Sequence, residues 1–109
     1  MINEDRYVSA ASDWLKMNVK IDTGFILISS AQHDGIIFSS GLSMSRFITE
    51  GTGDYWKKAI NDPVHSAKWV LLKDNPPDPL RQVIKYEDVL KFYQKVAEFP
   101  SVEIYQLKK

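Results

Sequence analysis

Two short runs of bulky apolar residues constrain the fold of this 109-residue chain more than any other feature of its sequence. They are Phe25–Ile28 and Trp69–Leu72, and neither alternates with polar residues. A strand with apolar side chains on both faces needs cover on both sides, as the central strands of parallel sheets have. The two runs therefore predict neighbouring parallel strands that are buried between layers of helices.

The segments around these runs alternate between helical and extended patterns. Apolar residues recur at helical spacing before the first run, and a shorter strand is expected at 46–49. Thr52 is placed to cap a helix that buries Tyr55 and pairs Asp54 with Lys58 at helical spacing. Asp78, which is followed by proline, is expected to cap a later helix.

The end of the chain reads as an antiparallel hairpin formed by the segments 93–99 and 102–107. Alternating strands and helices favour a parallel sheet with crossover helices. We therefore predict a single α/β domain over residues 1–109. It should have three layers, with a small, mostly parallel sheet, helices on both faces and a C-terminal antiparallel hairpin.

Composition excludes several classes of function. Fourteen basic residues balance fourteen acidic ones, so the formal net charge of +0 argues against nucleic acid as a partner. The chain has no cysteine, which excludes a disulfide framework, a thiolate nucleophile and a Cys-ligated zinc site. The apolar runs are too short to cross a bilayer, so we expect the chain itself to be soluble. No cofactor is expected.

The turn after the second predicted strand is a weak candidate for ligand binding. Glu50, Gly51, Thr52 and Gly53 lead into Asp54 at the expected start of a helix, where backbone N–H groups favour anions. The turn matches neither a Walker motif nor a complete dinucleotide fingerprint. The alternative is that its glycines only permit a tight connection between strand and helix.

His33 and Asp34 follow the first predicted strand and form a second candidate, together with Glu50. They could serve as a base with an orienting carboxylate, or as metal ligands. The alternative is a loop histidine followed by a helix-capping aspartate. Adjacent residues seldom aim at one point, so we assign no catalytic residue and no metal site.

Several segments together resemble a known family. They are a leading helix with Ala11, Trp14 and Leu15, the strand Phe25–Ser29, the stretch from Gly41 through Arg46–Trp56, the strand Ala67–Leu71 with Asp74 and Asp78 after it, and the terminal Val102–Tyr105. The chain resembles the soluble C-terminal domain of multi-spanning membrane glycosyltransferases. That family is similar to the dolichyl-phosphate-mannose protein mannosyltransferases and uses sugars carried on polyprenyl phosphate.

This resemblance implies that the chain is a fragment of a larger membrane protein and lies on its extracytoplasmic face. It implies a non-catalytic role, because the family's catalytic carboxylate lies near early membrane helices. The implied partners are the membrane-embedded portion of the same chain and a glycan, lipid-linked sugar or protein acceptor.

Two alternatives remain open beside the resemblance. The first is a free-standing module that binds an anionic ligand at residues 51–54. The second is a small hydrolase that uses His33, Asp34 and Glu50.

Overall fold

A computed structural model describes the backbone of residues 2–21 and 23–108 and the side chains of residues 10–21 and 23–108. Its α-helices are α1 (Ile2–Asn18), α2 (Ser30–Ser39), α3 (Asp54–Asn61), α4 (Pro79–Val83) and α5 (Tyr86–Phe92). Short 3-10 turns are η1 (Met44–Arg46), η2 (Glu50–Thr52) and η3 (Pro63–His65). Its strands are β1 (Ile26–Ile28), β2 (Phe47–Ile48), β3 (Trp69–Leu72), β4 (Tyr93–Glu98) and β5 (Glu103–Leu107).

The strands form one mixed sheet in the order β2-β1-β3-β5-β4. β1 lies between β2 and β3 and is parallel to both, with Ile26 opposite Phe47 and Trp69. β5 is antiparallel to β3 and to β4, so the final two strands add to the sheet as a hairpin. The predicted fold class is therefore confirmed, including the pairing of the two apolar runs.

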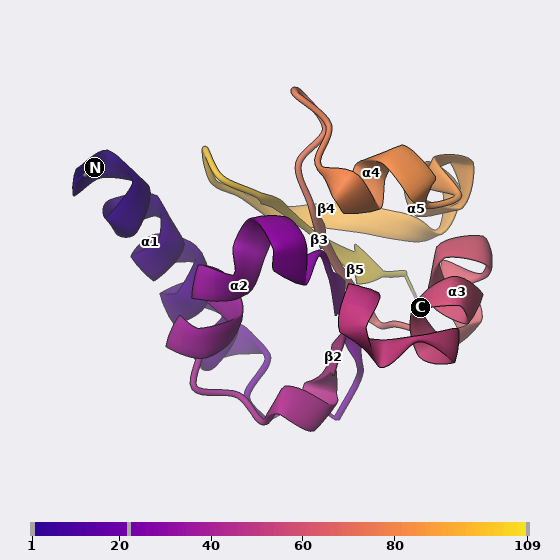
Figure 1. Ribbon diagram of the computed structural model, residues 1–109, viewed down its shortest axis with the longest axis horizontal. Coiled ribbons are helices and arrows are strands. Elements are labelled where there is room, and N and C mark those ends of the chain that lie inside the picture. The colour runs from indigo at the N-terminus through magenta and orange to yellow at the C-terminus, as the bar shows by residue number, and fades with distance from the viewer. Residues whose placement is uncertain (1, 22, 109) are drawn as a thin grey trace.

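Helices cover both faces of this sheet (Figure 1). On one face, α1 and α2 pack against a core that contains Leu15, Ile36 and Trp69. On the other face, α3, α4 and α5 pack against a second core that contains Leu27, Val70 and Leu80. Successive strand residues point to opposite faces, so every residue of β1 and β3 is buried in one core or the other.

Several local predictions differ from the structure. Phe25, predicted as the first residue of a buried strand, precedes β1 and is 50% exposed. The segment after β1 is a ten-residue helix that places His33 inside α2, at a kink, and not in a loop. Thr52 does not cap α3, because the preceding residue is Gly53 and no side chain accepts a hydrogen bond there. Tyr55 is 73% exposed and does not contribute to the core.

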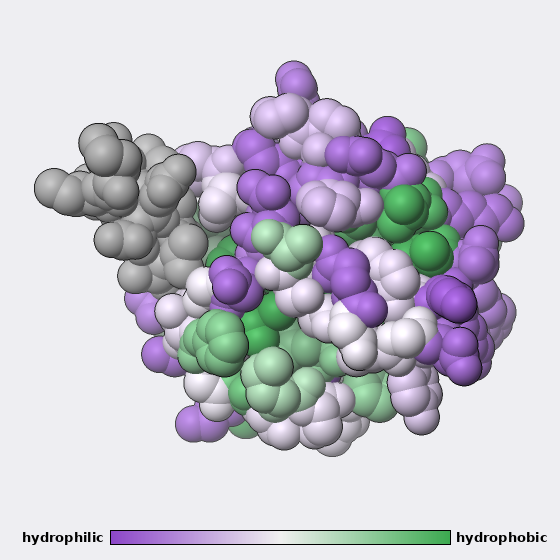
Figure 2. Space-filling model, viewed as in Figure 1, coloured by the Kyte–Doolittle hydropathy of each residue, from purple (hydrophilic) through white to green (hydrophobic). Residues whose placement is uncertain are grey.

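None of the helices in the described part of the chain is both long enough and apolar enough to span a membrane. Large apolar side chains nevertheless reach the surface, including Phe25, Phe38 and Met44. On the face shown in Figure 2, green apolar surface gathers over the part of the fold that holds α2 and β2 in Figure 1. This part of the surface is therefore less polar than its surroundings.

Trp69 offers a test of the buried sheet. It is 3% exposed, and its ring meets that of Trp14 edge to face at 5.8 Å. We expect Trp69→Ala to lower the free energy of unfolding by about 3–5 kcal/mol through cavity formation. Trp69→Phe should cost less, because the indole N–H has no hydrogen-bond partner among the described residues. Urea denaturation measures both, and an alanine variant within about 1 kcal/mol of the parent would contradict this assignment of the core.

Candidate functional site

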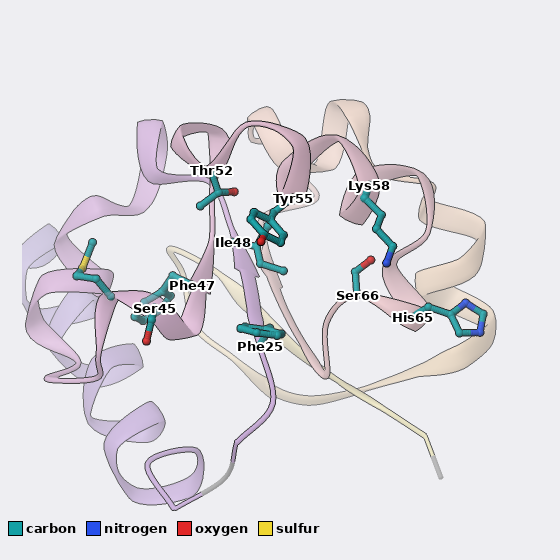
Figure 3. Close-up of a pocket in the computed structure, with 10 residues that line it drawn as sticks. Phe25, Ser45, Phe47, Ile48, Thr52, Tyr55, Lys58, His65 and Ser66 are labelled. Carbon is teal, nitrogen blue, oxygen red and sulfur yellow. The ribbon is translucent and has the colours of Figure 1, made fainter.

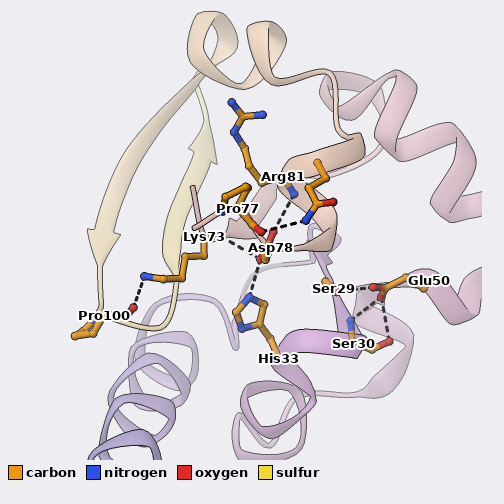
Figure 4. Close-up of polar contacts among 10 residues, drawn as sticks. Ser29, Ser30, His33, Glu50, Lys73, Pro77, Asp78, Arg81 and Pro100 are labelled. Atoms are coloured by element: carbon orange, nitrogen blue, oxygen red, sulfur yellow. Dashed lines mark hydrogen bonds and ion pairs between the residues drawn. The ribbon is translucent and has the colours of Figure 1, made fainter. Parts of the chain in front are cut away.

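The parallel strands end together at one edge of the sheet, which we call the carboxyl rim. In open α/β sheets this edge is where ligands usually bind. Ser29 and Ser30 follow β1, Glu50 follows β2, and Lys73 follows β3. Side-chain contacts join these connections in pairs (Figure 4).

Glu50 links the ends of β1 and β2. One carboxylate oxygen accepts hydrogen bonds from the backbone N–H of Ser30 at 2.7 Å and from its hydroxyl at 3.1 Å. The other accepts a hydrogen bond from the Ser29 hydroxyl. Burial raises the pKa of Glu50, but the bonds from Ser29, from its own backbone and from Ser30 together outweigh burial and lower it. Glu50 is therefore an ionised cross-link, which is unsuited to act as a general acid.

His33 and Asp78 link the ends of β1 and β3. The imidazole Nε2 lies 2.7 Å from a carboxylate oxygen, and the two residues are 5% and 4% exposed. Asp78 also accepts hydrogen bonds from the backbone N–H of Lys73 at 3.0 Å and of Arg81 at 2.8 Å. The second bond is the predicted cap of α4. One buried carboxylate thus holds a loop, a helix start and α2 together.

Asp34 takes no part in this arrangement. Its side chain is exposed, and the carboxylate that contacts His33 comes from a residue 45 positions later in the chain. The structure therefore does not pair His33 with its neighbour as a base and its orienting group. Both faces of the His33–Asp78 contact are also closed to solvent, which leaves no room for a substrate at this imidazole.

The turn at residues 51–54 satisfies part of its own hydrogen bonding. The side chain of Thr49 accepts from the N–H of Gly51, and its carbonyl accepts from both the N–H and the hydroxyl of Thr52. Gly53 has φ +63, where side chains are rarely found, and open space surrounds it. Two carboxylates, Glu50 and Asp54, flank the turn. Anion binding here stays a prediction, and these charges oppose it.

A pocket of about 680 Å³ lies beside the edge strand β2 and extends from Phe25 at the amino end of the parallel strands to Thr52 in the turn after β2 (Figure 3). Its apolar wall comprises Phe25, Met44, Phe47, Ile48 and Tyr55. Phe25 precedes β1, Met44 lies just before β2, and Tyr55 reaches down from α3. We call this the amino-end pocket. Its volume and mainly apolar lining are typical of small-molecule sites.

The polar side of the amino-end pocket includes Lys58, His65 and Ser66. Asp62 lies 2.9 Å from Nδ1 of His65, and the hydrogen bond from that imidazole lowers the pKa of the Asp62 carboxyl. The predicted pairing of Lys58 with Asp54 is not formed. The Lys58 ammonium makes no hydrogen bond or ion pair with any residue that the structure describes.

Of the residues predicted to bind a ligand, Thr52 lines the amino-end pocket. Phe25 and Tyr55 also line it, although the sequence pattern assigned Phe25 to a buried strand and Tyr55 to the core. Among the described side chains of residues 10–21 and 23–108, no cluster of three or more histidine, aspartate and glutamate residues could hold a metal ion. Comparisons with protein-family models, with curated proteins and with solved structures find no match to this chain.

Asp78 is expected to be structural. We predict that Asp78→Ala lowers the free energy of unfolding by about 2–4 kcal/mol, because it removes a helix cap and leaves buried donors unsatisfied. Asp34→Ala is the matched control and should have little effect, because that side chain is exposed. Thermal and urea unfolding of both variants measure the difference. Equal losses would show that Asp78 does not hold the rim.

Glu50 should make stability depend on pH. Its pKa is lowered from the ordinary value of 4.5 in the folded state. Its contribution is therefore present above the unfolded pKa and is lost as pH falls through the folded pKa. We expect Glu50→Gln to be less stable than the parent at about pH 7, with a difference that shrinks towards about pH 3. Urea unfolding at several pH values tests this, and a difference that grows in acid would contradict it.

Proposed function

We propose that the chain is a non-catalytic, extracytoplasmic domain of a membrane glycosyltransferase that uses a polyprenyl-phosphate-linked sugar. In this role it would position an acceptor, a lipid-linked donor or a partner for chemistry that takes place in the membrane-embedded portion of the same protein. The family assignment rests on the resemblance of the segments 25–29, 46–56 and 67–71 to that class of domain.

The single observation that carries the non-catalytic role is the closure of the carboxyl rim. Catalysis requires an acid, base or nucleophile within reach of a substrate. Here the Glu50 carboxylate is engaged by two serines, and His33 is buried against Asp78. Each candidate acid or base on the rim with a buried or half-buried side chain is thus engaged within the fold. Such a domain is suited to hold and orient a substrate or partner, while another part of the enzyme carries out the reaction.

The closed rim also disfavours the hydrolase alternative. A hydrolase would need His33, Asp34 and Glu50 to converge on one reacting atom. These side chains instead have separate environments, since one is buried, one is exposed and one bridges two strand ends. Their separation gives no point at which a water molecule could be activated beside a bound substrate.

Two measurements test the proposal. The reading frame that contains the chain should encode membrane-spanning segments upstream of it. The 109-residue chain alone, mixed with a polyprenyl-phosphate-linked sugar and an acceptor peptide, should release or transfer no sugar. Sugar release or transfer by the purified chain alone would contradict the non-catalytic role. A frame without membrane spans would contradict the family assignment.

A further inference from the structure

We propose that the amino-end pocket binds a small aromatic molecule that carries one carboxylate. This site does not use the Glu50 or His33–Asp78 contacts of the carboxyl rim and does not depend on the chain's place in a glycosyltransferase. The inference rests on three features of the described residues: exposed aromatic rings, a lysine without a hydrogen bond or ion pair, and two hydroxyl groups, those of Thr52 and Ser66, whose protons are already used.

The rings favour a flat apolar body. Phe25 is 50% exposed and Tyr55 is 73% exposed, although both belong to apolar walls of the same pocket. Figure 3 shows both rings labelled in the same pocket, together with Ile48. Aromatic pairs between a ligand and such rings contribute beyond the area that they bury. Covering these rings also removes apolar surface from water.

The charge favours a single carboxylate. In Figure 3 the Lys58 side chain runs from α3 towards Ser66 and His65 at one end of the pocket. His65 is paired with Asp62, whereas Lys58 makes no ion pair with a described residue and acts on the Asp62 carboxylate only at longer range, so its ammonium is available to a ligand. A charge-assisted hydrogen bond to a carboxylate would satisfy it. Asp54 and Asp62 lie close in sequence to Lys58, so a ligand with several negative charges would be repelled.

The hydroxyl groups of Thr52 and Ser66 restrict which chemical groups of a ligand can bind beside them. The Thr52 hydroxyl donates its proton to the carbonyl of Thr49, and the Ser66 hydroxyl donates to the carbonyl of Asp62. Towards the pocket these oxygens can therefore only accept hydrogen bonds. These two oxygens cannot donate to an anion, whereas Lys58 brings a positive charge and is therefore the main partner of the carboxylate, with the Ser45 and Tyr55 hydroxyls also in the pocket lining. The Thr52 and Ser66 oxygens can accept a bond from a ligand N–H or O–H group.

The experiment compares three probes of one shape: 2-naphthoate, the neutral 2-naphthamide and the cationic 2-naphthylmethylamine. Each is titrated into the 109-residue chain, with amide chemical shifts locating the site and calorimetry giving the affinity. We expect 2-naphthoate to bind most tightly, with shifts centred on Phe25, Tyr55 and Lys58. Lys58→Gln should weaken 2-naphthoate about tenfold and leave 2-naphthamide unchanged.

Matched controls separate the pocket from general effects. Lys57→Gln removes the same charge one residue away, and Phe38→Ala removes a ring as exposed as Tyr55, yet neither residue lines the pocket. Both should bind 2-naphthoate like the parent, whereas Tyr55→Ala should bind it several-fold more weakly. Lys57, Lys58, Phe38 and Tyr55 are all exposed, so melting temperatures should stay close to the parent's.

Three outcomes would overturn the proposal. They are an absence of saturable 2-naphthoate binding, an equal loss in the Lys57→Gln and Lys58→Gln variants, and binding of 2-naphthylmethylamine as tight as that of 2-naphthoate. None of them bears on whether the chain belongs to a membrane enzyme.

Discussion

Ile26, Leu27 and Ile28 pair in register with Trp69, Val70 and Leu71, and both strands are covered on both faces. Burying consecutive apolar residues removes surface from water on two sides at once, which gives these short strands a large share of the two cores. The other elements follow from this pairing. α1 and α2 must cover one face, α3, α4 and α5 the other, and the terminal hairpin extends the free edge of β3.

Parallel pairing also gathers the chain connections at the carboxyl rim, and polar side chains hold them there. Glu50 joins β1 to β2, and Asp78 joins α2 to the connection after β3. Buried polar groups are costly unless they are satisfied. Because these carboxylates accept several hydrogen bonds each, they fasten the rim. The same hydrogen bonds engage the polar groups at the edge of the sheet where other α/β proteins bind a ligand.

The sequence predicted the parts of the fold that depend on local pattern. The apolar runs identified β1 and β3, and aspartate before proline identified the cap of α4. The His33–Asp78 contact was out of reach, because it joins residues 45 positions apart and no periodicity connects them. Tyr55 was misassigned because helical spacing gives the direction of a side chain but not the extent of the sheet beneath it. Since β2 has only two residues, part of the surface below α3 stays open.

The short β2 strand therefore has a consequence for function. A longer edge strand would bring side chains beneath α3 and cover Phe25, which is 50% exposed. Instead the aromatic rings of Phe25 and Tyr55 and the ammonium of Lys58, unpaired among the described residues, face solvent in the amino-end pocket. Exposed apolar side chains in a concave pocket are stabilised more by contact with a ligand than by contact with water. The amino-end pocket therefore combines exposed side chains, such as Phe25, Tyr55 and Lys58, with a floor of Phe47 and Ile48 that belongs to the two buried cores.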